Sequence, residues 1–103
     1  MRDLVTALRA GPVIAGLKAP AAARRAIARG ARVLFVLTGT LFDLREVVAV
    51  GREANALVFA HLDLLQGIGR DAPGLRFLAR EVGVDGILTT RSFLIKAAKD
   101  EGL

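Results

Sequence analysis

The amino-acid sequence predicts an α/β fold in which short parallel strands alternate with helices. Apolar stretches rich in branched and aromatic residues recur along the chain and are typical of buried strands, most clearly at residues 32–37 (RVLFVL). An alanine-rich or amphipathic stretch with helix-start and helix-stop residues follows each strand. Strands and helices that alternate at a spacing of about 26 residues require parallel pairing through right-handed crossovers.

The first unit begins after a short helical turn, which we expect over residues 3–9 with Asp3 as its N-cap. A Gly-Pro pair ends this turn, and residues 12–17 (PVIAGL) are predicted to form the first strand. Residues 19–30 (APAAARRAIARG) are predicted to form a helix, because alanine is the best helix former. Proline in the first turn and glycine at the end are the residues expected at those positions.

The second unit contains the clearest strand, residues 32–37. Asp43 is predicted to be the N-cap of the helix that follows, because Glu46 stands three residues later as in a capping box. We expect this helix to run to about Ala54, with Gly51 as a weak point in its interior.

Two further units complete the pattern. Residues 57–62 (LVFAHL) are the third predicted strand, and Asp71 is the predicted cap of its helix. Residues 86–89 are the fourth predicted strand, and Ser92 is the predicted cap of a last helix over residues 93–101. The apolar faces of these two helices are expected at Leu75, Leu78, Ala79 and Val82 and at Leu94, Ile95 and Ala98.

Four such units within 103 residues make one domain at most. Two closures are compatible with them: an open doubly wound sheet, or part of a (β/α)8 barrel, which usually needs at least about 200 residues. In the second case residues 1–103 form a single, incomplete half-barrel domain. Two strand edges would then stay unpaired, so we expect a homodimer or aggregation in place of a well-behaved monomer.

The composition restricts the class of protein. Hydrophobic residues make up 53% of the chain and the mean hydropathy is +0.48, which favours strands buried on both faces. No apolar run reaches the roughly 18 residues of a membrane span. The N-terminus does not resemble a signal peptide, so we expect a cytoplasmic protein. There is no cysteine and a single histidine, so we expect neither a metal site nor a cofactor.

Charge is distributed unevenly between the two halves. Residues 1–52 carry nine basic and three acidic side chains, whereas residues 53–103 carry six and seven. A basic half indicates a nucleic-acid partner or an anionic ligand, or simply a solvated face. The five phenylalanines are expected in strands and on apolar faces, so base stacking is not predicted. The candidate RNA-binding residues are Arg24, Arg25, Arg29 and Arg32.

Ligands of both architectures bind at the carboxyl ends of the strands. His61 and Asp63 stand two apart in the third strand, so we expect them to share a face. They could act as acid and base, bind a metal or hold a ligand; alternatively, His61 is a core residue and Asp63 caps the loop. Arg91 could hold a phosphate or carboxylate, or pair with a surface acid. The other candidates at these strand ends are Lys18, Thr38, Gly39, Gln66 and Ser92.

The second half of the chain carries a more specific pattern: His-x-Asp-Leu after a strand, Gly-x-x-x-Asp, and then Gly-Ile-Leu-Thr-Thr-Arg-Ser. This pattern resembles the glycerol-3-phosphate responsive antiterminator family, the regulators of glycerol uptake operons. PVIAGLK and VLFVLTGTLFDLREVV resemble earlier segments of the family. The matching positions are His61, Asp63, Leu64, Gly67, Asp71, Gly74, Phe77, Gly86, Thr90, Arg91 and Ser92.

The resemblance implies a TIM-barrel-like regulator and not an enzyme. Such a regulator senses glycerol 3-phosphate and acts on leader messenger RNA to prevent premature termination of transcription. Family members continue into four more units, and position 66 is more often acidic in them than the Gln66 found here. The ligand-facing positions implied by the resemblance are Lys18, Thr38, Gly39, His61, Asp63, Arg91 and Ser92.

Two alternatives stay open. One is a phosphosugar-binding enzyme of the TIM-barrel type, with His61 and Asp63 as acid and base and Arg91 on the phosphate. The other is an inactive truncated fragment.

Overall fold

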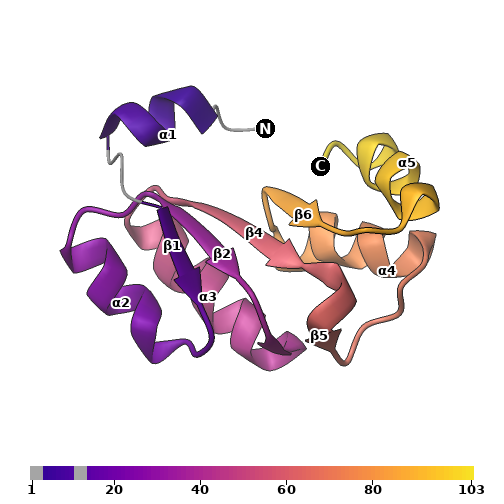
Figure 1. Cartoon of the computed structure of the whole chain (residues 1–103), viewed down its shortest axis with the longest axis horizontal. Helices are drawn as coiled ribbons and strands as arrows, with labels where there is room; N and C mark the ends of the chain where they lie inside the picture. The colour runs from indigo at the N-terminus through magenta and orange to yellow at the C-terminus, as the bar shows by residue number, and fades with distance from the viewer. Residues whose placement is uncertain (1–3, 11–13) are drawn as a thin grey trace.

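The computed structural model describes residues 4–10 and 14–103 and contains a four-stranded parallel sheet (Figure 1). Its strand order, β1-β2-β4-β6, follows the chain without reversal. A doubly wound sheet reverses its order at a switch point, whereas a barrel wall does not. The fold is therefore half of a barrel wall. The strands are β1 (Ile14–Leu17), β2 (Val33–Val36), β4 (Leu57–His61) and β6 (Gly86–Leu88).

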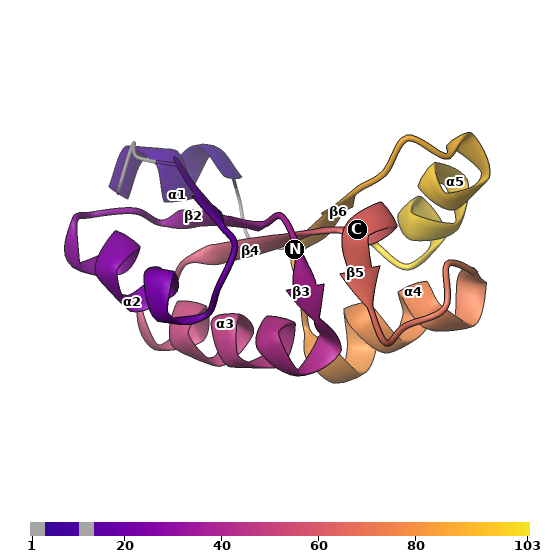
Figure 2. The same cartoon turned by 60° about the horizontal axis from the view of Figure 1, so that its bottom comes forward.

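Helices follow the strands as the sequence predicts. Figure 2 shows α2, α3 and α4 on one side of the sheet and the short α1 on the other. The predicted cap Asp3 and the start of the predicted first strand lie outside the described residues. The helices are α1 (Leu4–Ala10), α2 (Ala21–Ala28), α3 (Leu41–Glu53), α4 (Ala72–Phe77, continued by the π-helical turn η2 at Leu78–Val82) and α5 (Ser92–Asp100).

Strand side chains alternate between two apolar layers. Leu34 and Val58 are buried in the layer under the helices. Val33 and Leu57 point to the opposite face, where Ala7 of α1 is buried against them. Phe35 and Phe59, paired across β2 and β4, stack on this second face with ring centroids 5.1 Å apart. In a closed barrel this second face would be the interior.

The start of α3 differs from the prediction. Thr40, not Asp43, is the N-cap: its Oγ1 accepts from the Asp43 N–H at 3.2 Å, and the Thr40 N–H donates to Asp43 Oδ2 at 3.0 Å. The prediction failed because the chain is held extended through Thr40. Two short parallel strands, β3 (Gly39–Thr40) and β5 (Leu65–Gln66), pair there.

At the other helix ends, some predictions are confirmed and others are wrong. Asp71 caps α4 by accepting from the Gly74 N–H at 2.9 Å, and Gly83 ends η2 with φ +84°. Ser92 is not a cap, because Arg91 takes the N-cap position of α5 and its side chain makes no capping bond within the described structure. Ile95, predicted to face inward, is 43% exposed and lines a hollow together with Leu88 of β6.

Gly51 is not a weak point of α3. It is buried, and a Cβ there would lie 2.8 Å from Val58 Cγ2 of β4. The helix packs so closely on the sheet that only glycine fits. No helix of the described residues is long and apolar enough to cross a membrane.

Candidate functional site

The site is built where β4 and β6 end. β4 stops at His61, and the chain then makes a 3-10 turn over Leu62–Leu64. The prediction that His61 and Asp63 share one face of a strand is therefore wrong, since the turn takes Asp63 out of the strand. The turn carries Asp63 toward the loop that follows β6, where Thr89 and Thr90 lie.

The Asp63 carboxylate joins the two loops. Oδ1 accepts from the Thr89 hydroxyl at 2.9 Å, and Oδ2 accepts from the Thr90 N–H at 2.9 Å and from the Thr90 hydroxyl at 3.1 Å. The backbone bond from Thr90 is the main cause that lowers the pKa of Asp63, followed by the Thr89 hydroxyl, with Arg91 contributing. Asp63 is therefore an anionic structural clamp and a poor proton donor, as in the loop-capping interpretation.

Arg91 lies beside the Asp63 carboxylate, and about half of its side chain is exposed to solvent. Its Nε is 3.9 Å from Asp63 Oδ1, and its side chain is 52% exposed. The Arg91 N–H donates to the Thr89 hydroxyl at 3.2 Å, which fixes the backbone of the residue. A guanidinium that lies near a carboxylate and is half exposed to solvent can still bind a phosphate or carboxylate bidentately.

His61 is the last residue of β4 and is half-buried. Its alternation with Phe59 places it on the open, barrel-interior face of the sheet. Its Nδ1 is buried and has no hydrogen-bond partner among the described residues. A buried nitrogen without a partner is costly, so this atom suits a ligand hydroxyl or a further residue. Within the described chain no hydrogen bond or ion pair joins His61 to Asp63, so the expected acid–base pair is not formed.

Sequence reasoning missed Arg70. Its guanidinium Nη2 donates to the carbonyl oxygens of Asp63 at 2.7 Å and Leu65 at 3.2 Å. These bonds hold the 3-10 turn in the shape that presents the Asp63 carboxylate to the β6 loop. The only available signal was a basic residue a few positions after the turn, in a glycine-rich loop.

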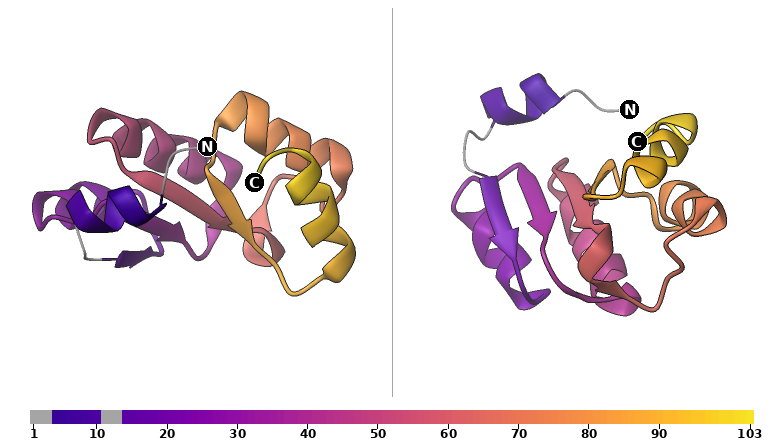
Figure 3. Two further views of the ribbon diagram at one scale, coloured as in Figure 1. Left: turned by 90° about the horizontal axis from the view of Figure 1, so that it is seen from above. Right: turned by 45° about the vertical axis from the view of Figure 1, so that its right-hand side comes forward.

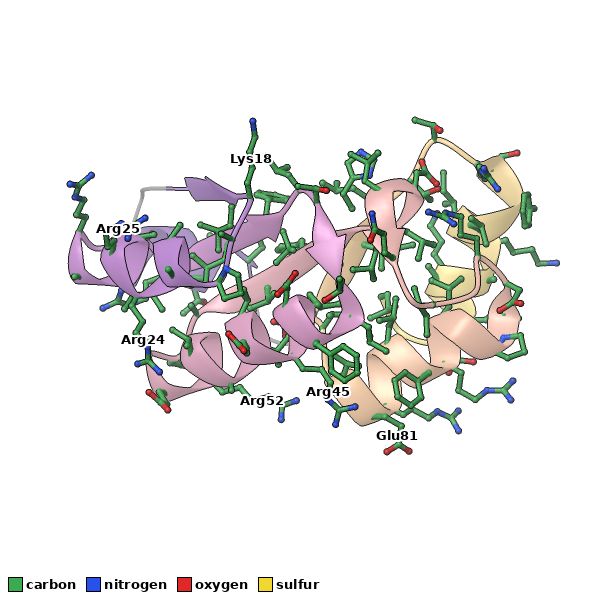
Figure 4. All side chains as sticks on the ribbon, turned by 90° about the horizontal axis from the view of Figure 1, so that it is seen from below. Lys18, Arg24, Arg25, Arg45, Arg52 and Glu81 are labelled. Carbon is green, nitrogen blue, oxygen red and sulfur yellow. The ribbon has the colours of Figure 1, made fainter. Side chains whose placement is uncertain are left out.

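The remaining candidates lie at the same edge of the sheet without forming one cluster. Lys18 follows β1 and projects away from the body of the protein (Figure 4). Thr38 is exposed after β2, and Gly39 has φ +127°, with Asp43 Oδ2 only 2.9 Å from where a Cβ would stand. Gln66 in β5 and Ser92 in the first turn of α5 are exposed. No group of three potential metal ligands occurs in the described residues.

The four arginines predicted to bind RNA differ in exposure and in their contacts. Arg32 is half-buried and donates to the carbonyl oxygens of Ala31 at 2.7 Å and Ile27 at 3.2 Å. Arg24 lies 3.9 Å from Glu53, and both side chains are about 70% exposed. Of these four arginines, only Arg25 and Arg29 are exposed without an ion pair inside the described ranges.

Comparison with known proteins agrees with this architecture. Residues 13–103 match the family described as glycerol-3-phosphate responsive antiterminator. The uncharacterized protein YgcP of Escherichia coli is 33% identical over 99 residues, which are 96% of this chain and 52% of that protein. The crystal structure of a glycerol uptake operon antiterminator regulatory protein from Listeria monocytogenes is similar in fold, with a TM-score of 0.78 and 23% identity. The likeness covers 87% of this chain and 49% of that one. The chain therefore spans about half the length of both relatives.

Proposed function

The chain belongs to the glycerol-3-phosphate responsive antiterminator family, and we propose that it supplies half of a glycerol 3-phosphate sensor that acts on leader messenger RNA. It is a regulator in this proposal and not an enzyme, and it works in the cytoplasm, where its RNA is made. The observation that carries the proposal is the position of Arg91. Its half-exposed guanidinium stands at the carboxyl edge, next to the N-terminus of α5.

This arrangement supports phosphate binding. The first N–H groups of a helix have no partner within the helix and attract anions. No side chain of the described structure caps α5, so a bound phosphate could supply the missing acceptor. The exposed Ser92 hydroxyl beside Arg91 can donate to the same phosphate, whereas the Thr90 hydroxyl already donates to Asp63.

In this proposal the glycerol end of bound glycerol 3-phosphate lies toward the open face of the sheet. The unpartnered Nδ1 of His61 supports this position, because it can pair with a ligand hydroxyl. Lys18, Thr38 and Gly39 complete the proposed ligand-facing set from the neighbouring strand ends. The alternative enzyme loses support, because the carboxylate of its proposed acid–base pair accepts three hydrogen bonds in the β6 loop.

Filter binding to a glycerol-operon leader RNA, with and without glycerol 3-phosphate, tests the proposal. We expect the ligand to change the affinity for this RNA, and we expect Arg91→Gln to remove that change. Lys96→Gln removes the same charge from the exposed face of α5 and should behave as the wild type. A chain that prefers the leader over unrelated RNA in neither condition would refute the proposal.

A further inference from the structure

Phe42 stands out on the surface. It is 79% exposed, the largest exposure among the large hydrophobic side chains of the described residues. The expectation that all phenylalanines lie in strands or on apolar faces is therefore wrong. Phe42 is the second residue of α3, so the chain presents an aromatic ring to solvent at the start of a long helix.

A preformed hollow adjoins this ring. It has a volume of about 400 Å³ and is lined by Thr40, Leu41, Phe42, Gln66 and Gly67. Its two walls are tied together, because β3 pairs with β5 through Thr40 and Gln66, and the capping box fixes the first turn of α3. Gly67 has φ +95°, and a Cβ there would lie 3.5 Å from Leu41 Cβ, so the walls approach closely at this residue.

The polar groups around the hollow suit a nucleotide. Gln66 is exposed, and its amide offers a donor and an acceptor for the edge of a base. Arg45 stands one turn after Phe42, and Arg52 stands two further turns on, about 10 Å along the axis. No ion pair joins either arginine to another residue in 4–10 or 14–103. Figure 4 shows both arginines projecting from the same side of α3.

We propose that the hollow takes one unpaired base of single-stranded RNA, stacked on Phe42, with the phosphate backbone passing Arg45 and Arg52. Sequence-tolerant binding of single strands combines an aromatic platform with cations along the backbone, and both are present here. The lining is largely apolar through Leu41 and Phe42, and it is the two exposed arginines on the same helix that favour an anionic partner over an apolar protein. The inference rests on the proposed RNA binding and places it on α3 and β5 in place of the α2 arginines.

Fluorescence anisotropy with a labelled single-stranded leader RNA tests the inference. We expect Phe42→Ala to weaken binding about tenfold or more and Phe42→Tyr to retain it, because tyrosine preserves the stacking face. Arg45→Gln should weaken binding and reduce the salt dependence of the affinity by about one counterion. Val5→Ala shortens another exposed apolar side chain, at 55%, and Lys96→Gln removes another exposed cation; both should bind as the wild type.

The outcomes separate this inference from the proposed function. If the wild type binds RNA and Phe42→Ala binds equally well, RNA does not bind at the hollow beside Phe42, while the proposed function stands. If Phe42→Ala weakens only self-association, measured by light scattering, the hollow is a protein contact and the inference is overturned. A wild-type chain that binds no RNA overturns both. Circular dichroism of each variant shows that a loss of binding is not a loss of folding.

Discussion

At the scale of single residues, Asp63 decides how the two polar loops are arranged. Its carboxylate accepts from Thr89 and Thr90, while Arg70 holds the backbone of its turn. Asp63 therefore positions Arg91 without itself donating a proton. A carboxylate used in this way makes the stability of the fold depend on pH.

The lowered pKa of Asp63 predicts the direction of that dependence. In the unfolded chain the carboxyl titrates near its ordinary 3.8, and in the folded chain it titrates lower. Its contribution to stability is complete above 3.8 and is lost as the pH falls through the folded value, because the unfolded state binds the proton first. In Asp63→Asn the amide cannot replace both anionic oxygens, so we expect a lower free energy of unfolding at pH 7.

Urea unfolding of the wild type and Asp63→Asn between pH 7 and pH 3 provides the measurement. The difference in unfolding free energy should be largest at neutral pH and should shrink below pH 3.8, since the other carboxyl groups are common to both proteins. A difference that stays constant with pH would show that the charge of Asp63 contributes nothing to stability.

At the scale of elements, the sequence predicted the strands and most helices, because these depend on local apolar patterns. The errors lie where a distant contact decides the local structure. Asp43 was the predicted cap of α3, but Thr40 takes that position because the pairing of β3 with β5 keeps it extended. His61 and Asp63 do not share a strand face as predicted, because hydrogen bonds from Arg70 and from the β6 loop hold residues 62–64 in a 3-10 turn. The sequence identified the polar strand ends as the candidate site but could not predict which of them make contact.

The N-caps of α3 and α5 lead to a prediction about the free energy of unfolding. Thr40→Ala removes the side-chain acceptor of the capping box and should lower the free energy of unfolding by about 1 kcal/mol. Ser92→Ala should change it by less than about 0.5 kcal/mol, because the exposed Ser92 side chain does not cap α5. Thermal unfolding of Thr40→Ala and Ser92→Ala tests both expectations. Equal losses for both would mean that the capping assigned from the structure is wrong.

At the scale of the whole molecule, the sheet has two edges that no other strand of the described residues pairs. β1 and β6 lie at its opposite sides (Figure 3). Beside β6, Leu88 and Ile95 are 38% and 43% exposed and line a hollow of about 210 Å³. A two-fold rotation about an axis parallel to the strands would place β6 of one copy parallel to β1 of another and close an eight-stranded barrel. We therefore propose that this chain forms a homodimer.

Light scattering coupled to size-exclusion chromatography tests the homodimer. We expect the mass of two chains, and we expect Leu88→Lys to lower the apparent mass by placing a charge at the β6 edge. Val5→Lys changes a more exposed apolar side chain, on α1, and serves as the control. A stable monomer with a sharp thermal transition would contradict the proposed association.

We propose that the carboxyl edge of the sheet binds glycerol 3-phosphate through Arg91. The most direct measurement is a titration of the isotope-labelled chain with glycerol 3-phosphate, followed by the NMR shifts of the backbone amides. We predict saturable shifts at residues 89–93, with smaller shifts at Thr38 and Gly39, and weaker effects from glycerol or inorganic phosphate alone. The absence of saturable shifts at residues 89–93, or the same shifts in Arg91→Gln, would contradict the claim.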